Sequence, residues 1–185
     1  MAEVKPEDIS YRHYKPTEPV ETLQKLIEVE LSEPYSIYLY RHFAVDYPEL
    51  TFVAEHNGQI VGCIMGKFHD KADKDATGKK PEGEPVQTEE NAIITGRYGY
   101  IAMLAVLPAY RKKNIGKRLV KLFIEECRQN NCDYVKLETE VVNIGALRLY
   151  ESCGFIKKKH YRKYYQNGND AYGLRYYLKS LVLAE

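Results

Sequence analysis

The sequence lacks the side chains and motifs that mark several large protein classes. Its four cysteines, Cys63, Cys127, Cys132 and Cys153, form no C-x-x-C pair, so we expect reduced thiols and neither a disulfide framework nor a zinc site. The five histidines are scattered and no H-E-x-x-H motif occurs, which also argues against a metal site. The formal net charge is only +1, so the chain lacks the basic surplus that DNA-binding proteins need for phosphate contacts.

Long apolar runs are also missing. No segment approaches the roughly 20 apolar residues that span a bilayer, and the acidic, polar residues 1–8 do not resemble a secretory signal. With 185 residues, of which 44% are hydrophobic and 29% charged, the chain has the composition of one globular domain with a full core. We therefore expect a single cytoplasmic domain over residues 1–185 that does not bind membranes.

Tryptophan is absent, whereas tyrosine is abundant, with 17 residues. A tyrosine has an apolar ring and a polar tip, which suits a groove that is partly wet. Tyrosine is also a common strand residue, so both interpretations stay open for any one of them.

The hydrophobic pattern alternates between strand-like and helix-like segments. Strands are expected at 9–14, 50–55, 59–68, 97–107, 134–141, 155–165 and 171–178, and helices at 17–31, 37–44, 116–131 and 143–152. Thr17 is the expected cap of the first helix, and Asn57-Gly58 and Asn167-Gly168 are expected turns. This order predicts an α/β domain in which helices cover a mixed sheet.

Residues 70–95 change in character. Charged residues, glycine and proline dominate there, and apolar residues almost vanish. Because strand-like sequence resumes directly afterwards, we expect a long exposed loop within one sheet rather than a linker between domains.

The segment from Val106 to Leu119 has the pattern of an anion-binding site. A strand ends, a basic turn follows, and a helix begins near Gly116. The free N–H groups of a helix start carry positive partial charge, and glycine lets the backbone approach a phosphate. The basic residues of the segment are Arg111, Lys112, Lys113, Lys117 and Arg118. The alternative interpretation is a solvated helix start capped by Asn114, since short glycine motifs are weak signals.

Arg111-x-x-Asn114-x-Gly116 resembles the Q/R-x-x-G-x-G/A motif with which GNAT acetyltransferases cradle the pyrophosphate of acetyl-CoA. Asn114 replaces the first glycine, and asparagine tolerates the left-handed backbone better than most residues. Leu104-Ala105-Val106 is similar to the bulged strand that pairs with the pantetheine arm in this family. The resemblance implies the GNAT fold, with a mixed, mostly antiparallel sheet of about seven strands and about four helices. It also implies acetyl-CoA as cosubstrate, bound by Leu104, Ala105, Val106, Arg111, Lys112, Lys113, Asn114, Ile115, Gly116 and Lys117.

Residues 143–155 resemble a second GNAT motif, N-x-x-A-x-x-x-Y-x-x-x-G-F. In the family the asparagine contacts the cofactor and the tyrosine lies near its sulfur. The resemblance therefore implies that Asn143 and Tyr150 bind acetyl-CoA and that Tyr150 protonates the departing thiolate. The alternatives are a helix N-cap for Asn143 and a core position for Tyr150.

Two carboxylates mark the strand at 134–141. Glu138 and Glu140 point to one face of this strand and Thr139 to the other. A buried carboxylate is costly unless it lines water or serves a function, so Glu138 is the candidate general base, acting through a water, with Tyr100 in reserve. The alternative is that this strand end emerges into solvent, an interpretation that fits Glu140 better than Glu138.

Three further segments, 31–38, 98–106 and 164–172, resemble NatC catalytic subunits among the N-terminal acetyltransferases. The resemblance implies a peptide groove formed by Leu31, Glu33, Pro34, Tyr35, Tyr100, Tyr164 and Tyr165. For each of these residues the alternative is ordinary surface packing.

The resemblance to NatC implies the substrate and the partners. The substrate would be the α-amino group of a nascent chain that begins with Met followed by a bulky hydrophobic residue. The partners would be a large auxiliary subunit, a small third subunit and the ribosome. No nucleophile motif occurs, which favours direct transfer, with a backbone N–H near Val106 stabilising the oxyanion. The alternatives are a GNAT enzyme for lysine side chains or small amines, and a non-catalytic acyl-CoA-binding module.

Overall fold

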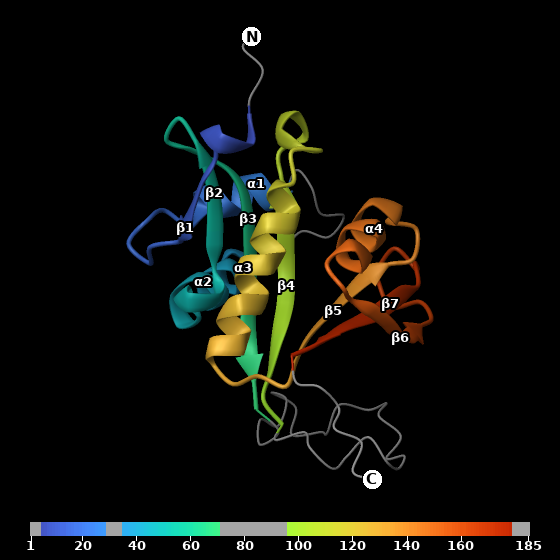
Figure 1. Cartoon of the computed structure of the whole chain (residues 1–185). Coiled ribbons are helices and arrows are strands. Elements are labelled where there is room, and N and C mark those ends of the chain that lie inside the picture. The colour runs from blue at the N-terminus through green and yellow to red at the C-terminus, as the bar shows by residue number, and fades with distance from the viewer. Residues whose placement is uncertain (1–4, 29–34, 71–95, 179–185) are drawn as a thin grey trace.

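The computed structural model describes residues 5–28, 35–70 and 96–178 (Figure 1). One seven-stranded sheet forms its centre, in the order β1-β2-β3-β4-β5-β7-β6. The strands are β1 (Ser10–His13), β2 (Phe52–His56), β3 (Gln59–His69), β4 (Tyr98–Val106), β5 (Tyr134–Glu140), β6 (Ile156–Tyr161) and β7 (Ala171–Tyr177). All neighbouring strands are antiparallel except β4 and β5. The prediction of a mixed, mostly antiparallel sheet is confirmed.

Helices cover both faces of this sheet (Figure 1). In the described ranges they are α1 (Glu21–Glu28), α2 (Ile37–Asp46), α3 (Ile115–Gln129) and α4 (Ile144–Ser152), with short 3-10 turns at Pro6–Asp8, Pro48–Leu50 and Pro108–Tyr110. One apolar core joins α3 and α4 to the sheet and contains Phe123, Leu137 and Tyr150. The other core lies under α1 and α2 and contains Ile27 and Met103. The sheet therefore buries side chains on both faces.

Two glycines let α3 approach the sheet closely. A Cβ atom at Gly66 would lie 2.5 Å from Cζ of Phe123, and one at Gly99 would lie 2.2 Å from Sγ of Cys127. Phe123 and Cys127 are fully buried, so neither has free space to move into. The short distance between α3 and the sheet thus requires glycine, which has no Cβ atom, at positions 66 and 99.

We expect Gly99→Ala to lower the free energy of unfolding by about 1–3 kcal/mol, the usual cost of overpacking a core. Gly145→Ala is the matched control, because its new Cβ would meet only Oδ1 of Asn143 at an ordinary 3.7 Å. Urea unfolding of both variants measures the difference. Equal stability of Gly99→Ala and the wild type would mean that Cys127 relaxes without cost.

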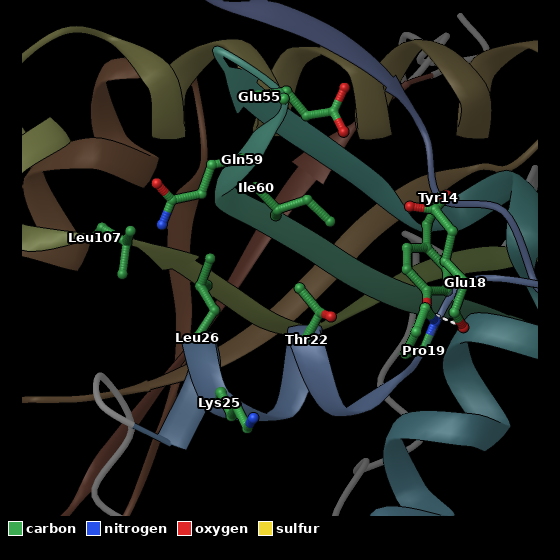
Figure 2. Close-up of a pocket in the computed structure, with 11 residues that line it drawn as sticks. Tyr14, Glu18, Pro19, Thr22, Lys25, Leu26, Glu55, Gln59, Ile60 and Leu107 are labelled. Carbon is green, nitrogen blue, oxygen red and sulfur yellow. Dashed lines mark hydrogen bonds between the residues drawn. The ribbon is translucent and has the colours of Figure 1, made fainter.

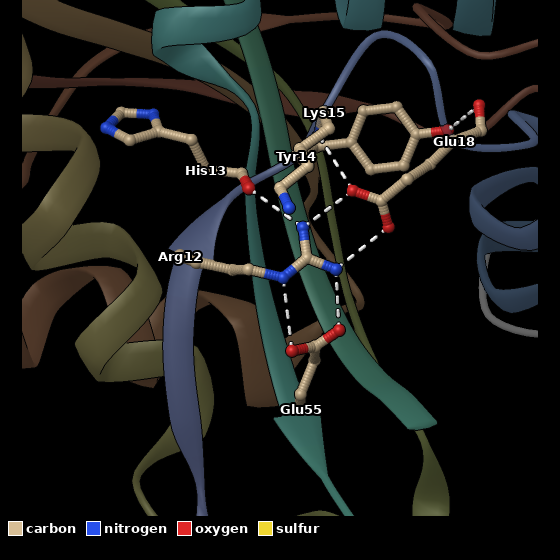
Figure 3. A network of polar contacts seen from close by, with 6 residues as sticks. All are labelled: Arg12, His13, Tyr14, Lys15, Glu18 and Glu55. Carbon is tan, nitrogen blue, oxygen red and sulfur yellow. Dashed lines mark hydrogen bonds and ion pairs between the residues drawn. The ribbon is translucent and has the colours of Figure 1, made fainter. Parts of the chain in front are cut away.

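The chain before α1 corrects one expectation, because Thr17 does not cap a helix and α1 begins at Glu21. Arg12 donates to the two carboxylate oxygens of Glu18 at 2.7 and 2.8 Å and to those of Glu55 at 2.6 and 3.1 Å (Figure 3). The Tyr14 hydroxyl also donates to the Glu18 carbonyl, at 2.6 Å. These contacts with β1 and β2 keep residues 14–20 from continuing α1 toward the N-terminus. Local sequence patterns do not predict such contacts.

The chain after β6 corrects a second expectation, because the strand ends at Tyr161 rather than at residue 165. Lys163 adopts a left-handed backbone with φ of 48°, and its N–H donates to the Asp170 carboxylate at 2.8 Å. Tyr164 and Tyr165 consequently lie in the β6–β7 loop. The expected turns are confirmed, since Asn57, Gly58 and Gly168 have φ of 50°, 76° and 82°.

Some expectations fall on other parts of the chain. Residues 71–95 of the expected loop lie outside the described residues, and so do residues 29–31 of the expected first helix. The same holds for the predicted peptide-binding residues Leu31, Glu33 and Pro34.

Candidate active site

The parallel strands β4 and β5 part in the middle of the sheet (Figure 1). Among the described residues they pair only at 98–100 with 134–136, although β4 continues to Val106 and β5 to Glu140. The β4 strand carries one extra residue, Ala102, because Ile101 pairs with Gly66 and Met103 with Met65. The bulge therefore lies at Ala102, earlier than the predicted 104–106 segment. The parting leaves the β4 edge at Leu104–Val106 facing a gap in which an extended ligand can pair with its backbone.

The turn between β4 and α3 forms a concave, basic helix start. Asn114 precedes the helix with a left-handed backbone, φ of 62° and ψ of 11°, which confirms that asparagine takes the place of a motif glycine. Lys112 is left-handed as well, with φ of 61°, a feature that the sequence did not predict. Nε of Arg111 donates to the Val106 carbonyl at 3.2 Å and ties the turn to the strand end. Within the described part of the chain, the Asn114 side chain makes no capping bond, so the first-turn N–H groups remain available to an anion.

The residues at this helix start fit a pyrophosphate group. Arg111 and Lys112 are exposed, Lys113 and Lys117 are partly buried, and the helix dipole adds to their charge. A Cβ atom at Gly116 would lie 3.2 Å from Cδ2 of Leu149 on α4. The glycine thus also allows the first turn of α3 to pack against α4. Acetyl-CoA would be held by this cradle and by the open edge of β4.

The second predicted cofactor contact lies on α4. The Asn143 side chain accepts a hydrogen bond from Ala146 N–H at 3.0 Å, so this residue is the N-cap of α4. Tyr150 is buried beside Phe155, with ring centroids 5.5 Å apart. Burial raises the pKa of the Tyr150 hydroxyl. Both residues therefore have a structural role, and their contacts with acetyl-CoA remain a prediction.

A pocket of about 310 Å³ opens beside the split on the α1 and α2 side of the sheet. It brings together five residues that the sequence singled out for the substrate or the chemistry: Tyr35, Tyr100, Glu138, Tyr164 and Tyr165. Ala102 and Gln166 complete its lining. The carboxylate of Glu138 is the acidic group of this lining, so the pocket suits an amine.

The Glu138 side chain is only 7% exposed and is held by two neighbours. The Tyr100 hydroxyl donates a hydrogen bond to its carboxylate, and Nζ of Lys136 lies 3.2 Å from Oε1. Burial, followed by the Glu138 charge, raises the pKa of Tyr100 well above its usual value. Tyr100 consequently stays protonated near neutral pH, and the expectation that it is a reserve base is physically unfavourable. Sequence reasoning missed Lys136, although its place two residues before Glu138 puts both on one face of β5.

Glu140, the second carboxylate of β5, holds the β6–β7 loop. Nδ2 of Asn169 donates to it at 2.9 Å and Nδ2 of Asn167 at 3.3 Å. The loop carries Tyr164 and Tyr165, so these bonds help to place two walls of the pocket. Glu140 is partly exposed, as the alternative interpretation of this strand end allowed, and it also anchors the loop.

A larger pocket, of about 540 Å³, lies between α1 and the β2–β3 hairpin (Figure 2). Its lining includes Tyr14, Glu18, Leu26, Ile60 and Leu107, and none of the predicted site residues. Its chemistry also differs from that expected of the active site. The Glu18 and Glu55 carboxylates that line it already form ion pairs with Arg12 (Figure 3). Size alone therefore does not identify the active site.

The described residues provide neither a metal-binding cluster nor a membrane-spanning helix. Across 5–28, 35–70 and 96–178, no group of three or more His, Cys, Asp or Glu side chains is arranged to hold a metal ion. In those ranges no helix has the length and apolar character required to cross a membrane.

The sequence and the fold match known acetyltransferases. Residues 17–155 match the model of the acetyltransferase (GNAT) family. N-alpha-acetyltransferase 30 of Saccharomyces cerevisiae is 39% identical over 158 residues, covering 83% of this chain and 78% of the yeast protein. The human protein of that name is 40% identical over 173 residues, covering 92% of this chain but 41% of its own length. A chain in the crystal structure of the NatC complex bound to Gag peptide and CoA has 37% identity and a TM-score of 0.76, covering 93% of this chain and 99% of that chain.

These matches extend across both halves of the split, from the segment before α1 to the end of α4. They bear out the resemblance that the two motifs implied, including the CoA-binding class of the fold. The chain therefore belongs to the GNAT acetyltransferase family, and within it to the N-alpha-acetyltransferases.

Proposed function

We propose that this enzyme acetylates peptide N-termini that begin with Met followed by a bulky hydrophobic residue. The observation that carries the proposal is the pocket at the strand split, where tyrosine rings surround one nearly buried carboxylate. Tyrosine rings offer apolar surface to a Met side chain and hydroxyl groups to the peptide backbone. The similarity to N-alpha-acetyltransferase 30 and to a NatC structure with bound peptide supports the coarser part of the proposal, a peptide N-terminus as the acetyl acceptor.

The α-amine requires little basic assistance, because its pKa is about 7.7–8.0. We assign the proton acceptor to Glu138, directly or through one water, since this carboxylate lines the pocket. Tyr100 remains protonated and orients the carboxylate through its hydrogen bond. Acetyl-CoA, when bound, supplies the activated acetyl thioester, and the backbone N–H groups of Leu104 and Val106 are the donors on the open edge, since Ala105 faces β3.

Tyr150 acts on the leaving group as a hydrogen-bond donor in this scheme. A thiol has a pKa of about 8.5, whereas the pKa of the Tyr150 hydroxyl is raised above 10 by burial. Complete proton transfer from Tyr150 to a thiolate would therefore be uphill. A hydroxyl that keeps its proton still stabilises the developing negative charge.

We also propose that the enzyme works with auxiliary subunits on nascent chains at the ribosome, in the cytoplasm. The proposal of auxiliary subunits is supported by the NatC complex, in which the matched chain is one component. The ribosome and the compartment rest on the resemblance to NatC catalytic subunits. Co-sedimentation of the tagged protein with ribosomes from cell extract is the direct test.

Peptides that begin Met-Leu, Met-Ile or Met-Phe should be acetylated with at least tenfold higher kcat/KM than peptides that begin Met-Asp or Ser. Each CH₂ group buried in an apolar pocket contributes about 0.8 kcal/mol, and an unpaired buried carboxylate is penalised. Initial rates on peptides that differ only in their first two residues give the comparison. A preference for Met-Asp or Ser would assign another N-terminal class, and acetylation of internal lysines alone would assign a lysine acetyltransferase.

A further inference from the structure

The ion pair of Lys136 and Glu138 lies at the point where β4 and β5 part. Lys136 is the last residue of β5 that pairs with β4, opposite Tyr100. Glu138 follows on the same face, just beyond the split, and lines the candidate substrate pocket. Nζ and Oε1 are 3.2 Å apart, and the two side chains are 25% and 7% exposed. Such a pair is shielded from solvent far more than an ordinary surface pair.

The surroundings close the other sides of the Glu138 carboxylate. Tyr100 donates to it from β4. On β7 the residue opposite Glu138 is Gly173, and a Cβ atom there would lie 2.9 Å from Cε2 of Tyr161. The absence of a side chain at Gly173 therefore lets the Tyr161 ring lie next to the ion pair. With the Glu138 side chain only 7% exposed, an amine would reach the carboxylate through the pocket that it lines.

Several titratable or charged side chains face this ion pair from neighbouring elements. Arg175 lies opposite Lys136 on β7, but its guanidinium stacks over the Tyr134 ring at 4.3 Å. Among the described residues they include Tyr35, His69, Tyr98, Tyr100, Glu140, Lys159, Tyr161, Tyr164, Tyr165 and Arg175.

Lys136 stays positively charged in this setting. Burial by itself lowers the pKa of its ammonium group, but the Glu138 carboxylate, together with Tyr161 and Tyr98, outweighs that cost, and the pKa is raised. The charge is therefore constant over the pH range in which an α-amine titrates.

We propose that Lys136 is a positioning residue for acetyl transfer, whose ammonium group holds the Glu138 carboxylate turned toward the pocket. The inference rests on the proposed function, in which Glu138 accepts the amine proton. Without the ammonium group the carboxylate would lose its counter-ion in a site with little water. It would then turn away from the pocket for part of the time, which slows proton transfer from the amine. Lys136 acts through Glu138 and touches no reacting atom.

The test compares Lys136→Met with the wild type across pH 6–9, using the peptide or amine that the wild type acetylates fastest. Methionine keeps the length of the stem and removes the charge. We expect the single-turnover rate to fall about tenfold at pH 6.5, where the α-amine is still mostly protonated and a misplaced base is felt most. The rate should recover above pH 8.5, where the amine is largely neutral, and acetyl-CoA affinity should stay unchanged.

Two further variants separate positioning from structural loss. Lys136→Arg retains the charge and should restore most of the rate and the wild-type profile. Lys157→Met is the control, because it removes a surface ion pair with Glu151 at 2.9 Å whose side chains are 43% and 45% exposed. It should leave the profile unchanged. Should Lys136→Met unfold, Lys136→Gln supplies the same comparison with a polar side chain.

An unmoved pH profile in Lys136→Met would overturn the inference, whether the rate stays normal or falls equally at every pH. The proposed function fails differently, through a wild-type enzyme that prefers another N-terminus or a lysine side chain. The test uses whichever peptide or amine the wild type acetylates fastest. The role of Lys136 can therefore be measured in the same way even if the proposed substrate is wrong.

Discussion

Gly116→Glu is expected to abolish measurable acetyl-CoA binding, with a loss of at least a hundredfold, or about 2.7 kcal/mol. The new carboxylate would lie at the helix start, where the structure offers free N–H groups and basic side chains to an anion. Two like charges about 4 Å apart repel by about 4 kcal/mol at an effective dielectric constant of 20. Isothermal titration calorimetry with acetyl-CoA measures the loss directly.

The contact between α3 and α4 requires two controls for this variant. A Cβ atom at Gly116 already meets Leu149 at 3.2 Å, so any side chain strains the packing. Gly116→Ala reports that strain alone, and Gly116→Gln adds the size of glutamate without its charge. The electrostatic part of the loss is the difference between the glutamine and glutamate variants. If Gly116→Glu binds acetyl-CoA as tightly as Gly116→Gln, the cradle does not hold the phosphates.

Much of the fold was predictable because its signals are local. Alternating apolar residues predicted the strands, and Asn57-Gly58 predicted the hairpin turn that its positive φ values confirm. The left-handed backbone of Asn114 followed from the motif and from the tolerance of asparagine for that conformation. In the same way, the spacing of Glu138 and Glu140 predicted a shared face of β5.

The features of the fold and of the site that the sequence did not predict depend on contacts between segments far apart in the chain. Arg12 and Glu55 are separated by 43 residues, yet they form an ion pair, and Arg12 binds Glu18 as well, which delays the start of α1. Glu140 and Asn169 are 29 residues apart, and their bond helps to place the loop with Tyr164 and Tyr165. Periodicity and capping rules describe neighbours in the sequence and cannot predict such distant pairs. The sequence therefore identified five residues of the pocket, but it did not show which side chains hold those five in place.

The arrangement around Glu138 favours this residue over Tyr100 as the proposed base. A hydroxyl whose pKa is raised by burial and by a neighbouring carboxylate keeps its proton at neutral pH. The same hydroxyl fixes the carboxylate, and Lys136 balances its charge. Of Glu138, Tyr100 and Lys136, only Glu138 is therefore suited to the proposed role of the base.

Glu138→Gln is expected to reduce the single-turnover rate about 10²–10⁴-fold at pH 7, the usual contribution of an acid–base group. Glutamine preserves the size and polarity of the side chain but cannot accept the amine proton. Acetyl-CoA affinity should change little, because Glu138 lines the pocket on the amine side of the split. The defect should shrink above pH 8, where a growing share of the α-amine, with a pKa of about 7.7–8.0, is already neutral.

Rapid-quench measurements are preferred to steady-state rates, since slow product release would hide part of the effect. Glu140→Gln provides the comparison on the same strand face. It weakens the bonds that hold the β6–β7 loop, so it should raise KM for the peptide and leave the pH dependence of the chemical step unchanged. A Glu138→Gln enzyme with near-wild-type single turnover at pH 7 would reduce Glu138 to a substrate-positioning group. Because Tyr100 holds its proton too tightly to replace it, the acceptor would then have to be a water chain that leads to solvent through the pocket.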